Sequence, residues 1–291
     1  MPFNIINTVI DHSSDAGFRA WAQEFHALLL AAGWVNTADT GQVDLTTMLK
    51  PAAITAAGYK IYYLNDSLHA SAPCYLKWEP GSGGTSTAPQ FHCTLGVATN
   101  GAGTLTGVFS ARSACVHESS NLSTVIARNT YVTWGDGYFS VAWKAGGSGP
   151  IGYGFFSVNR FTDAIGTPVA DGYAMYNRTT TGVTCQQHCI SFLTSTAYPI
   201  STTYCMIGGA VTNSLVAGVA QTYRHYVIKP RMQLNPFALT VLNSELTAGN
   251  VFQADVIGTG LKDWMPVGLV MAGAAVTGAS GIYGMAIPWE A

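Results

Sequence analysis

The sequence predicts a mainly β protein, an antiparallel and hairpin-rich β-sandwich with one amphipathic helix near the N-terminus. Three observations support this fold class. One stretch near the start carries apolar residues at helical spacing. From Gly58 onward, aromatic and β-branched runs alternate with Gly, Asn, Asp, Ser and Thr, as is typical of strands joined by turns. Asn100-Gly101 and Trp134-Gly135-Asp136-Gly137 are strong signals for hairpin turns.

The predicted helix follows the sequence "HSSD", in which Ser13, Ser14 and Asp15 are all suitable N-cap residues. Gly33 is a natural terminator because glycine readily adopts the left-handed conformation that ends a helix. The apolar side of the helix carries Phe18, Trp21, Phe25, Leu28 and Leu29. Two interpretations stay open: this side packs on its own domain, or Phe18, Trp21 and Phe25 contact a neighbouring subunit.

The predicted strands group into hairpins. "YKIYYLN" and "CYLKWEP" form one pair, joined through "DSLHASAP", and place Tyr62, Leu64, Tyr75 and Trp78 on one face of a β core. "FHCTLGVAT" and "TLTGVFSA" form a second pair around "NGAG". "TYVTWGDGYFSVAWK" contains a third hairpin, and "IGYGFFSVNRF" and "DGYAMYN" supply further strands.

The chain divides into an N-terminal segment with the helix (1–50), a hairpin region (51–112) and a β-rich region (113–291). No linker of distinct composition separates them, so the third region can be continuous with the second.

The composition predicts self-association. The chain has 13 basic and 15 acidic residues among 291, 48% hydrophobic residues and a mean hydropathy of +0.22. A monomer of this mass exposes roughly 12,000 Å², which leaves about one charge per 430 Å². Thr179 to Tyr223 contains no charged residue, and such neutral polar surfaces lose less on desolvation than charged ones. We therefore expect a cyclic homo-oligomer.

Membrane insertion and nucleic-acid binding are not expected. The most apolar window, 265–289, is interrupted by Gly and Pro, so it does not form a lipid-facing helix of about 20 residues. A formal net charge of −2 without a basic cluster gives nucleic acid no electrostatic footprint. Residues 1–10 lack the pattern of a secretory signal, which predicts assembly in a cytoplasm. The scattered cysteines suggest buried free thiols.

The sequence also gives little indication of an enzyme, a metal or a cofactor. Ser82 in "PGSGG" and Ser148 in "GGSGPIG" lack the spacing of a nucleophile elbow. "GAGTLTG" misses the dinucleotide-binding spacing. Cys185, His188 and Cys189 in "CQQHC" could hold a metal only with a second compact ligand pair, which the chain does not offer. We expect no catalytic residue, no cofactor and no metal.

Flat aromatic side chains keep one binding function open, since they stack on sugars as well as filling protein cores. The candidates for a glycan or subunit contact are Trp78, Trp134, Trp143, Tyr131 and Tyr138.

Several segments taken in order resemble structural virion proteins of tailed bacteriophages, those of the tail, baseplate or fibres. The segments are "AAGWVNTADTGQVD", "GYKIYYLNDSLHASAPCYLKWEPGSGG", "FHCTLGVATNGAGTLTG", "FSVNRFTDAIGTPVADGYAMY" and "GMAIPWEA". The resemblance covers nearly the whole chain and carries no catalytic motif. It implies a repeated-copy subunit of the particle that contacts itself and other virion proteins. Alternatives are a module that binds host-surface glycan and a capsid decoration protein.

Overall fold

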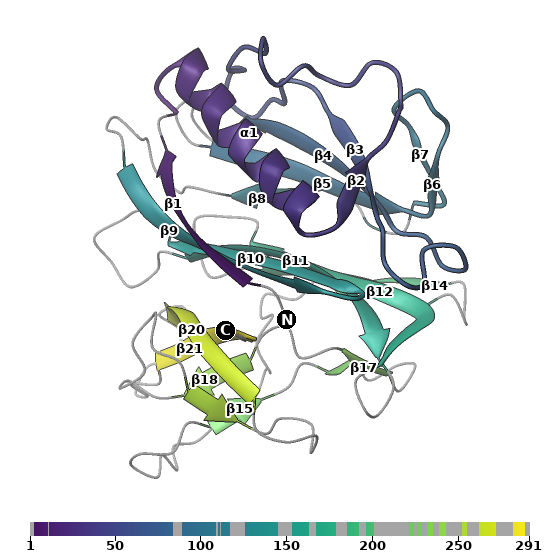
Figure 1. The fold of residues 1–291 in the computed structure, drawn as a ribbon, viewed down its shortest axis with the longest axis vertical. Helices are drawn as coiled ribbons and strands as arrows, with labels where there is room; N and C mark the ends of the chain where they lie inside the picture. Colours follow the sequence, from purple (N-terminus) through teal and green to yellow (C-terminus); the bar gives the residue numbers. More distant parts are fainter. Residues whose placement is uncertain are drawn as a thin grey trace.

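The structure is a computed structural model of the 291-residue chain. It describes the backbone of residues 3–10, 12–83, 89–108, 110, 112–116, 126–144, 153–162, 167–178, 185–191, 196–200, 221–223, 226–227, 232–234, 239–242, 252–254, 262–271 and 282–288. In these residues the fold is mainly β, the strand pairs are antiparallel, and one α-helix lies near the N-terminus (Figure 1). The predicted fold class is confirmed.

Three sheets lie in layers (Figure 1). We call them the helix-side sheet, the central sheet and the C-terminal sheet. The helix-side sheet has the order β2 (Trp34–Asn36), β3 (Lys60–Leu64), β4 (Tyr75–Ser82), β5 (Pro89–Gly96) and β8 (Ser113–Val116). A small hairpin, β6 (Ala98–Thr99) and β7 (Leu105–Thr106), follows β5.

The central sheet begins with β1 (Phe3–Ile10) and continues through β9 (Ile126–Gly135), β10 (Tyr138–Lys144), β11 (Tyr153–Thr162), β12 (Pro168–Arg178), β13 (Cys185–Ser191) and β14 (Thr196–Ile200). Two short strands join it from the side, β16 (Tyr226–Val227) and β17 (Met232–Leu234). The C-terminal sheet has the order β15 (Gln221–Tyr223), β18 (Leu239–Leu242), β21 (Ile282–Pro288), β20 (Lys262–Met271) and β19 (Phe252–Ala254).

The helix, α1 (Asp15–Ala31), begins and ends where the sequence predicts. The Ser14 side chain caps its first turn by accepting a hydrogen bond from the Gly17 N–H. Gly33 has a φ of +83° just after the last turn, a left-handed conformation that glycine adopts without steric cost.

The main core lies between α1, the helix-side sheet and the central sheet. Phe25 of α1 stacks on Trp78 with ring centroids 5.4 Å apart, and Phe91 meets Phe156 of the central sheet edge-on at 5.6 Å. Such aromatic pairs add to the free energy gained by area burial. The helix-side sheet and the central sheet are therefore held together by packed aromatic side chains.

The packing of α1 decides between its two interpretations. Phe18 is 0% exposed, Trp21 1% and Phe25 3%, all within this core. The interpretation that these side chains contact a neighbouring subunit is wrong, because the chain's own sheets already cover them.

The hairpin predictions are confirmed for β3–β4 and β9–β10. The predicted pairing of 91–99 with 104–111 is confirmed only for the short strands β6 and β7, because β5 pairs with β4 and β8 instead. The predicted core face contained one error. Tyr62, Leu64 and Trp78 are buried in the core, whereas Tyr75 is half-buried and pairs with Tyr63 on the opposite face. Strand residues alternate between faces, so Leu76 rather than Tyr75 shares the core face with Trp78.

The predicted divisions at 50 and 112 are not boundaries between sheets. The helix-side sheet takes β2 from the first segment, β3, β4 and β5 from the second, and β8 from the third. Strand β1 also pairs with β9 across all eight of its residues.

Candidate interaction surface

Residues 49–57, which we call the 49–57 loop, carry apolar side chains at the surface. Leu49 is 67% exposed and Ile54 71%. Lys50 is the only charged residue in the loop, and its ammonium group donates to the Ser13 carbonyl at 3.1 Å. The Lys50 backbone N–H donates to Asp15 Oδ1 at 2.8 Å. The loop therefore starts from a fixed point at the beginning of α1.

Strand β4 holds the other half of the loop. The Ser82 N–H donates to the Thr55 carbonyl at 3.0 Å, and the Ile54 N–H donates to the Gly83 carbonyl at 2.8 Å. A Cβ atom on Gly81 would lie 2.2 Å from the Thr55 oxygen, so only glycine lets the loop approach β4 this closely.

A buried serine–histidine contact lies beneath the loop. His12 Nε2 is 3.3 Å from Ser82 Oγ, and this hydroxyl donates to the Pro51 carbonyl at 3.1 Å. A nucleophile and its base would show a similar contact. Here His12 and Ser82 are both 0% exposed, and the hydroxyl proton is directed to a backbone oxygen. The pair anchors the loop and presents no nucleophile to a substrate.

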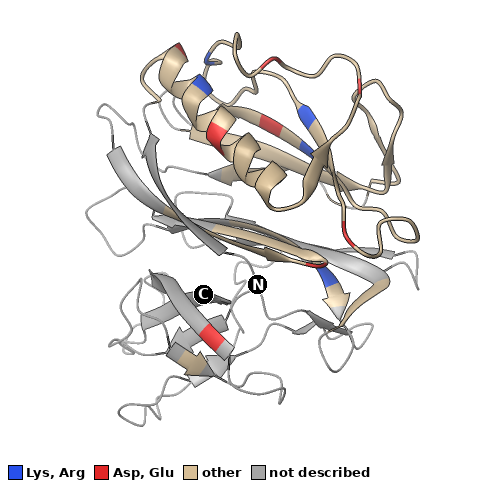
Figure 2. Ribbon diagram, viewed as in Figure 1, with Lys and Arg blue, Asp and Glu red and all other residues tan. Residues whose placement is uncertain are grey.

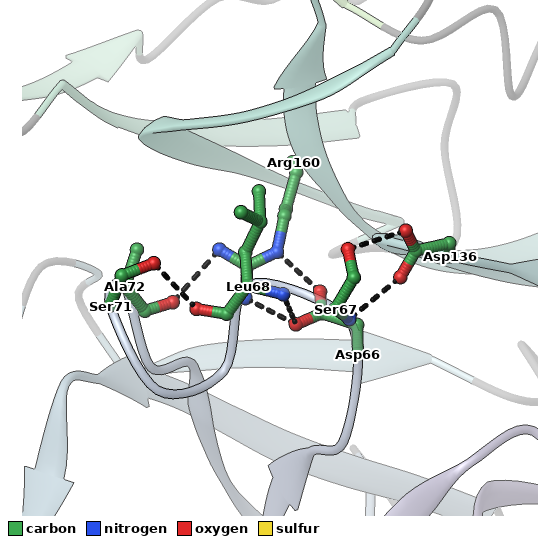
Figure 3. A network of polar contacts seen from close by, with 7 residues as sticks. All are labelled: Asp66, Ser67, Leu68, Ser71, Ala72, Asp136 and Arg160. Carbon is green, nitrogen blue, oxygen red and sulfur yellow. Dashed lines mark hydrogen bonds and ion pairs between the residues drawn. The ribbon is translucent and has the colours of Figure 1, made fainter.

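A second anchor joins the helix-side sheet to the central sheet (Figure 3). The Arg160 guanidinium of β11 forms an ion pair with Asp66 in the β3–β4 connection and donates to the Ala72 carbonyl at 2.8 Å. The side chains of Arg160 and Asp66 are 1% and 2% exposed. In the same connection, the Ser67 hydroxyl donates to Asp136 at 2.6 Å. Buried charges persist when they are paired and hydrogen-bonded, so this network fixes how the two sheets meet.

The central sheet presents two contrasting faces. Phe139, Val141, Phe156 and Val158 point into the main core. The opposite face carries Thr133, Ser140, Ser157 and Asn159 in adjacent register positions. We call these four residues the polar face.

All four side chains of the polar face are 3% exposed or less. Strand β20 of the C-terminal sheet contacts β10 and β11, and Figure 1 places that sheet on the side of the central sheet away from α1. Ser140 and Ser157 share a hydrogen bond of 2.8 Å, whereas Thr133 Oγ1 and Asn159 Oδ1 have no hydrogen-bond partner in the described part of the chain. The chain thus buries a neutral polar face between two layers.

Asp39 holds the β6–β7 hairpin against the segment that follows β2. Its carboxylate accepts hydrogen bonds from the Thr99 hydroxyl, the Thr37 hydroxyl and the Gly103 N–H. Burial alone would raise the pKa of Asp39, but these hydrogen bonds outweigh it and hold the pKa below its usual value. The cluster stabilises the loops, and its acceptor oxygens are already occupied.

Two histidines are shifted toward their neutral forms. Burial lowers the pKa of His26, and the nearby Lys60 lowers it further; His26 Nδ1 is 2.6 Å from the Tyr62 hydroxyl. Burial also lowers the pKa of His92, assisted by Arg112 and opposed by Glu79. Burial raises the pKa of Tyr62, so neither His26 nor Tyr62, which are in contact, is charged at neutral pH.

The predicted aromatic candidates do not gather into a binding surface in the described residues. Trp78 is 0% exposed and Tyr138 5%, so neither presents a face to a sugar, and the prediction is wrong for these two. Trp134 is half-buried and packs against the main core. Tyr131 lies on β9 and Trp143 on β10, but their side chains are outside the described part.

Cysteine placement agrees with the sequence where it is described. Cys74, Cys93 and Cys115 are buried thiols that form no disulfide in the described part of the chain. Burial raises the pKa of Cys74 and of Cys93, which keeps both protonated and unreactive. Cys185, His188 and Cys189 lie on β13, with side chains outside the described part. Among the residues searched, no three His, Cys, Asp or Glu side chains gather as metal ligands would.

The charged residues of the described part are scattered. Figure 2 shows them as isolated positions separated by neutral stretches, without a basic or acidic cluster. An exposed ion pair, Arg112 to Glu79 at 2.7 Å, joins β4 to the residue before β8. No helix in the described residues combines the length and hydropathy needed to span a bilayer.

Comparison of the chain with protein-family models, with curated proteins and with solved structures finds no match.

Proposed function

We propose that this chain is a structural subunit of a bacteriophage particle, a component of the tail, baseplate or fibre that assembles by contacts with itself and with other virion proteins. The proposal gives the chain no catalytic step and no cofactor. Its place in the virion, after assembly in the host cytoplasm, rests on the resemblance of the five quoted segments. Its assembly role rests on the physical character of the surfaces described above.

The observation that carries the assembly role is the buried polar face. Thr133, Ser140, Ser157 and Asn159 are almost completely covered by another layer although none of them is apolar. Hydroxyl and amide groups cost much less to desolvate than charges do. A chain that uses hydroxyl and amide groups for a contact within itself can use groups of the same kind for contacts between copies.

The low density of charged residues on the surface supports the same assembly role. The accessible surface is 12259 Å², and the chain has only 13 basic and 15 acidic residues to distribute over it. Charged residues make up about 25% of an ordinary soluble domain, against 10% here, and interfaces are depleted of charged residues at their centres. Closed symmetric assembly would cover this surface and leave no growing edge.

The test is the solution mass of the full chain, measured by light scattering over a concentration series. We expect one oligomer of defined size that dissociates only on dilution. A monomer at every concentration would contradict the assembly role. In that case, binding to a glycan array that is lost on Trp134→Ala would favour the glycan-binding alternative instead.

A further inference from the structure

The 49–57 loop combines exposure with an unfavourable backbone conformation at the same residue. Ile54 has a φ of +62°, the only positive φ at a non-glycine residue in the described part of the chain. A β-branched side chain in the left-handed region is an outlier, because its Cβ substituents crowd the backbone. Yet the side chain of Ile54 is 71% exposed and gains little from packing within its own chain.

The local turn shows which residues would fit this position better. The Thr55 N–H donates to the Ala52 carbonyl at 3.3 Å, which makes Ile54 the third residue of a tight turn. Turns with a positive φ at this position usually have Gly or Asn there. Ile54 is thus unfavourable for the turn, although its side chain is largely exposed.

The loop cannot relieve the conformation by moving away. The hydrogen bonds of Ile54 and Thr55 to residues on and just after β4, and the close approach over Gly81, hold its backbone on both sides of the turn. A rigid loop loses little conformational entropy when it binds, which favours affinity. Backbone strain held in place by its surroundings is a feature of contact and switch sites.

We propose that the 49–57 loop is a contact site for a second copy of this chain, in which Ile54 becomes buried. This inference rests on the proposed assembly function and names the surface that performs it. The occupant follows from charge. The side chains that the loop exposes most, Leu49 and Ile54, carry no charge, so a charged partner surface would lose hydration against them and gain no counter-charge. The thinly charged surface of this chain does not incur that loss.

Three single-residue variants of the full chain test the inference by sedimentation velocity. Ile54→Gly removes the side chain and suits the positive φ. Gly81→Ala keeps Ile54 but displaces the loop, because the added Cβ would meet the Thr55 oxygen at 2.2 Å. Val108→Ser is the control: it removes an apolar side chain that is 53% exposed and lies outside the loop.

We expect Ile54→Gly to raise the self-dissociation constant by at least about 10-fold, as truncation of a central interface residue does. Its melting temperature at a concentration where both proteins are monomeric should be equal to that of the wild type or higher. Gly81→Ala should also raise the self-dissociation constant, and Val108→Ser should leave this constant unchanged.

Each opposite outcome is distinguishable. If the wild type associates and Ile54→Gly associates equally well, the loop inference is overturned and the assembly role stands. A clear fall in the melting temperature of Ile54→Gly would also overturn it, since Ile54 would then serve the fold of its own chain. If the wild type does not associate at all, the proposed function fails first.

Discussion

In the described part of β9, β10 and β11, the two faces of the central sheet carry different side chains, yet both are buried. Along β11, Phe156 and Val158 alternate with Ser157 and Asn159, and none of the four is exposed. In most antiparallel sheets this alternation marks one face for the core and one for water. Here the polar face meets a third layer. This chain therefore uses neutral polar groups in a contact that is almost completely buried.

The largest expected difference separates two neighbouring residues. Phe156→Ala should lower the free energy of unfolding by about 4 kcal/mol, because it leaves a cavity between the two sheets of the main core. Ser157→Ala, one residue further on the opposite face, should lower it by about 1 kcal/mol through lost hydrogen bonds. Urea denaturation measures both, and equal losses would remove the distinction between the faces.

The buried ion pair between Arg160 and Asp66 gives the next largest effect. Arg160→Met should cost about 3 kcal/mol, because it leaves the Asp66 carboxylate buried without its partner. The double variant Arg160→Met/Asp66→Asn removes that unpaired charge and should recover part of the loss. Chemical denaturation checks both variants. A double variant no more stable than the single one would show that the pair does not act through charge burial.

Two substitutions on the polar face should change the free energy of unfolding in opposite directions. Thr133→Val removes a buried hydroxyl that has no hydrogen-bond partner in the described part of the chain, and should raise the free energy of unfolding by about 1 kcal/mol. Ser140→Ala breaks the 2.8 Å bond to Ser157 and should lower it by a similar amount. Thermal denaturation of the two variants side by side distinguishes them. Destabilisation by Thr133→Val would mean that its hydroxyl has a partner.

The smallest effect concerns pH. The pKa values of His26 and His92 lie below about 6.5 in the folded state, so the unfolded chain binds protons first as the pH falls. The free energy of unfolding should therefore be highest above pH 6.5 and fall as the pH decreases through the range between the unfolded and folded pKa values. Urea denaturation across this range measures the slope. His26→Asn, which does not titrate there, should reduce the slope, and an unchanged slope would contradict the role of His26.

The local features of the fold could be predicted from the sequence because their causes are local. Ser14 and Gly33 bound a helix of regular apolar spacing, and the turns at Asn100-Gly101 and Asp136-Gly137 join strands that are close in sequence. Tyr75 is the exception, because alternation along the strand places a residue three positions from Trp78 on the opposite face.

The candidate site could not be predicted, because its causes lie far apart in the chain. The 49–57 loop has no periodic pattern, and its conformation depends on Gly81 and Ser82 in a different element. Arg160 did carry a signal, because it is the only charged residue between Lys144 and Asp163. Its partner, Asp66, lies 94 residues away, and only the fold brings the two together.

The most direct test of neutral, closed contacts is the salt dependence of self-association. The dissociation constant of the full chain, measured by sedimentation velocity at salt concentrations from about 0.05 M to about 1 M, should stay nearly constant or decrease. Charged contacts are screened over this range, whereas contacts of hydroxyl, amide and apolar groups are not. A dissociation constant that rises steeply with salt would show that charge pairs hold the subunits together and would contradict the central claim.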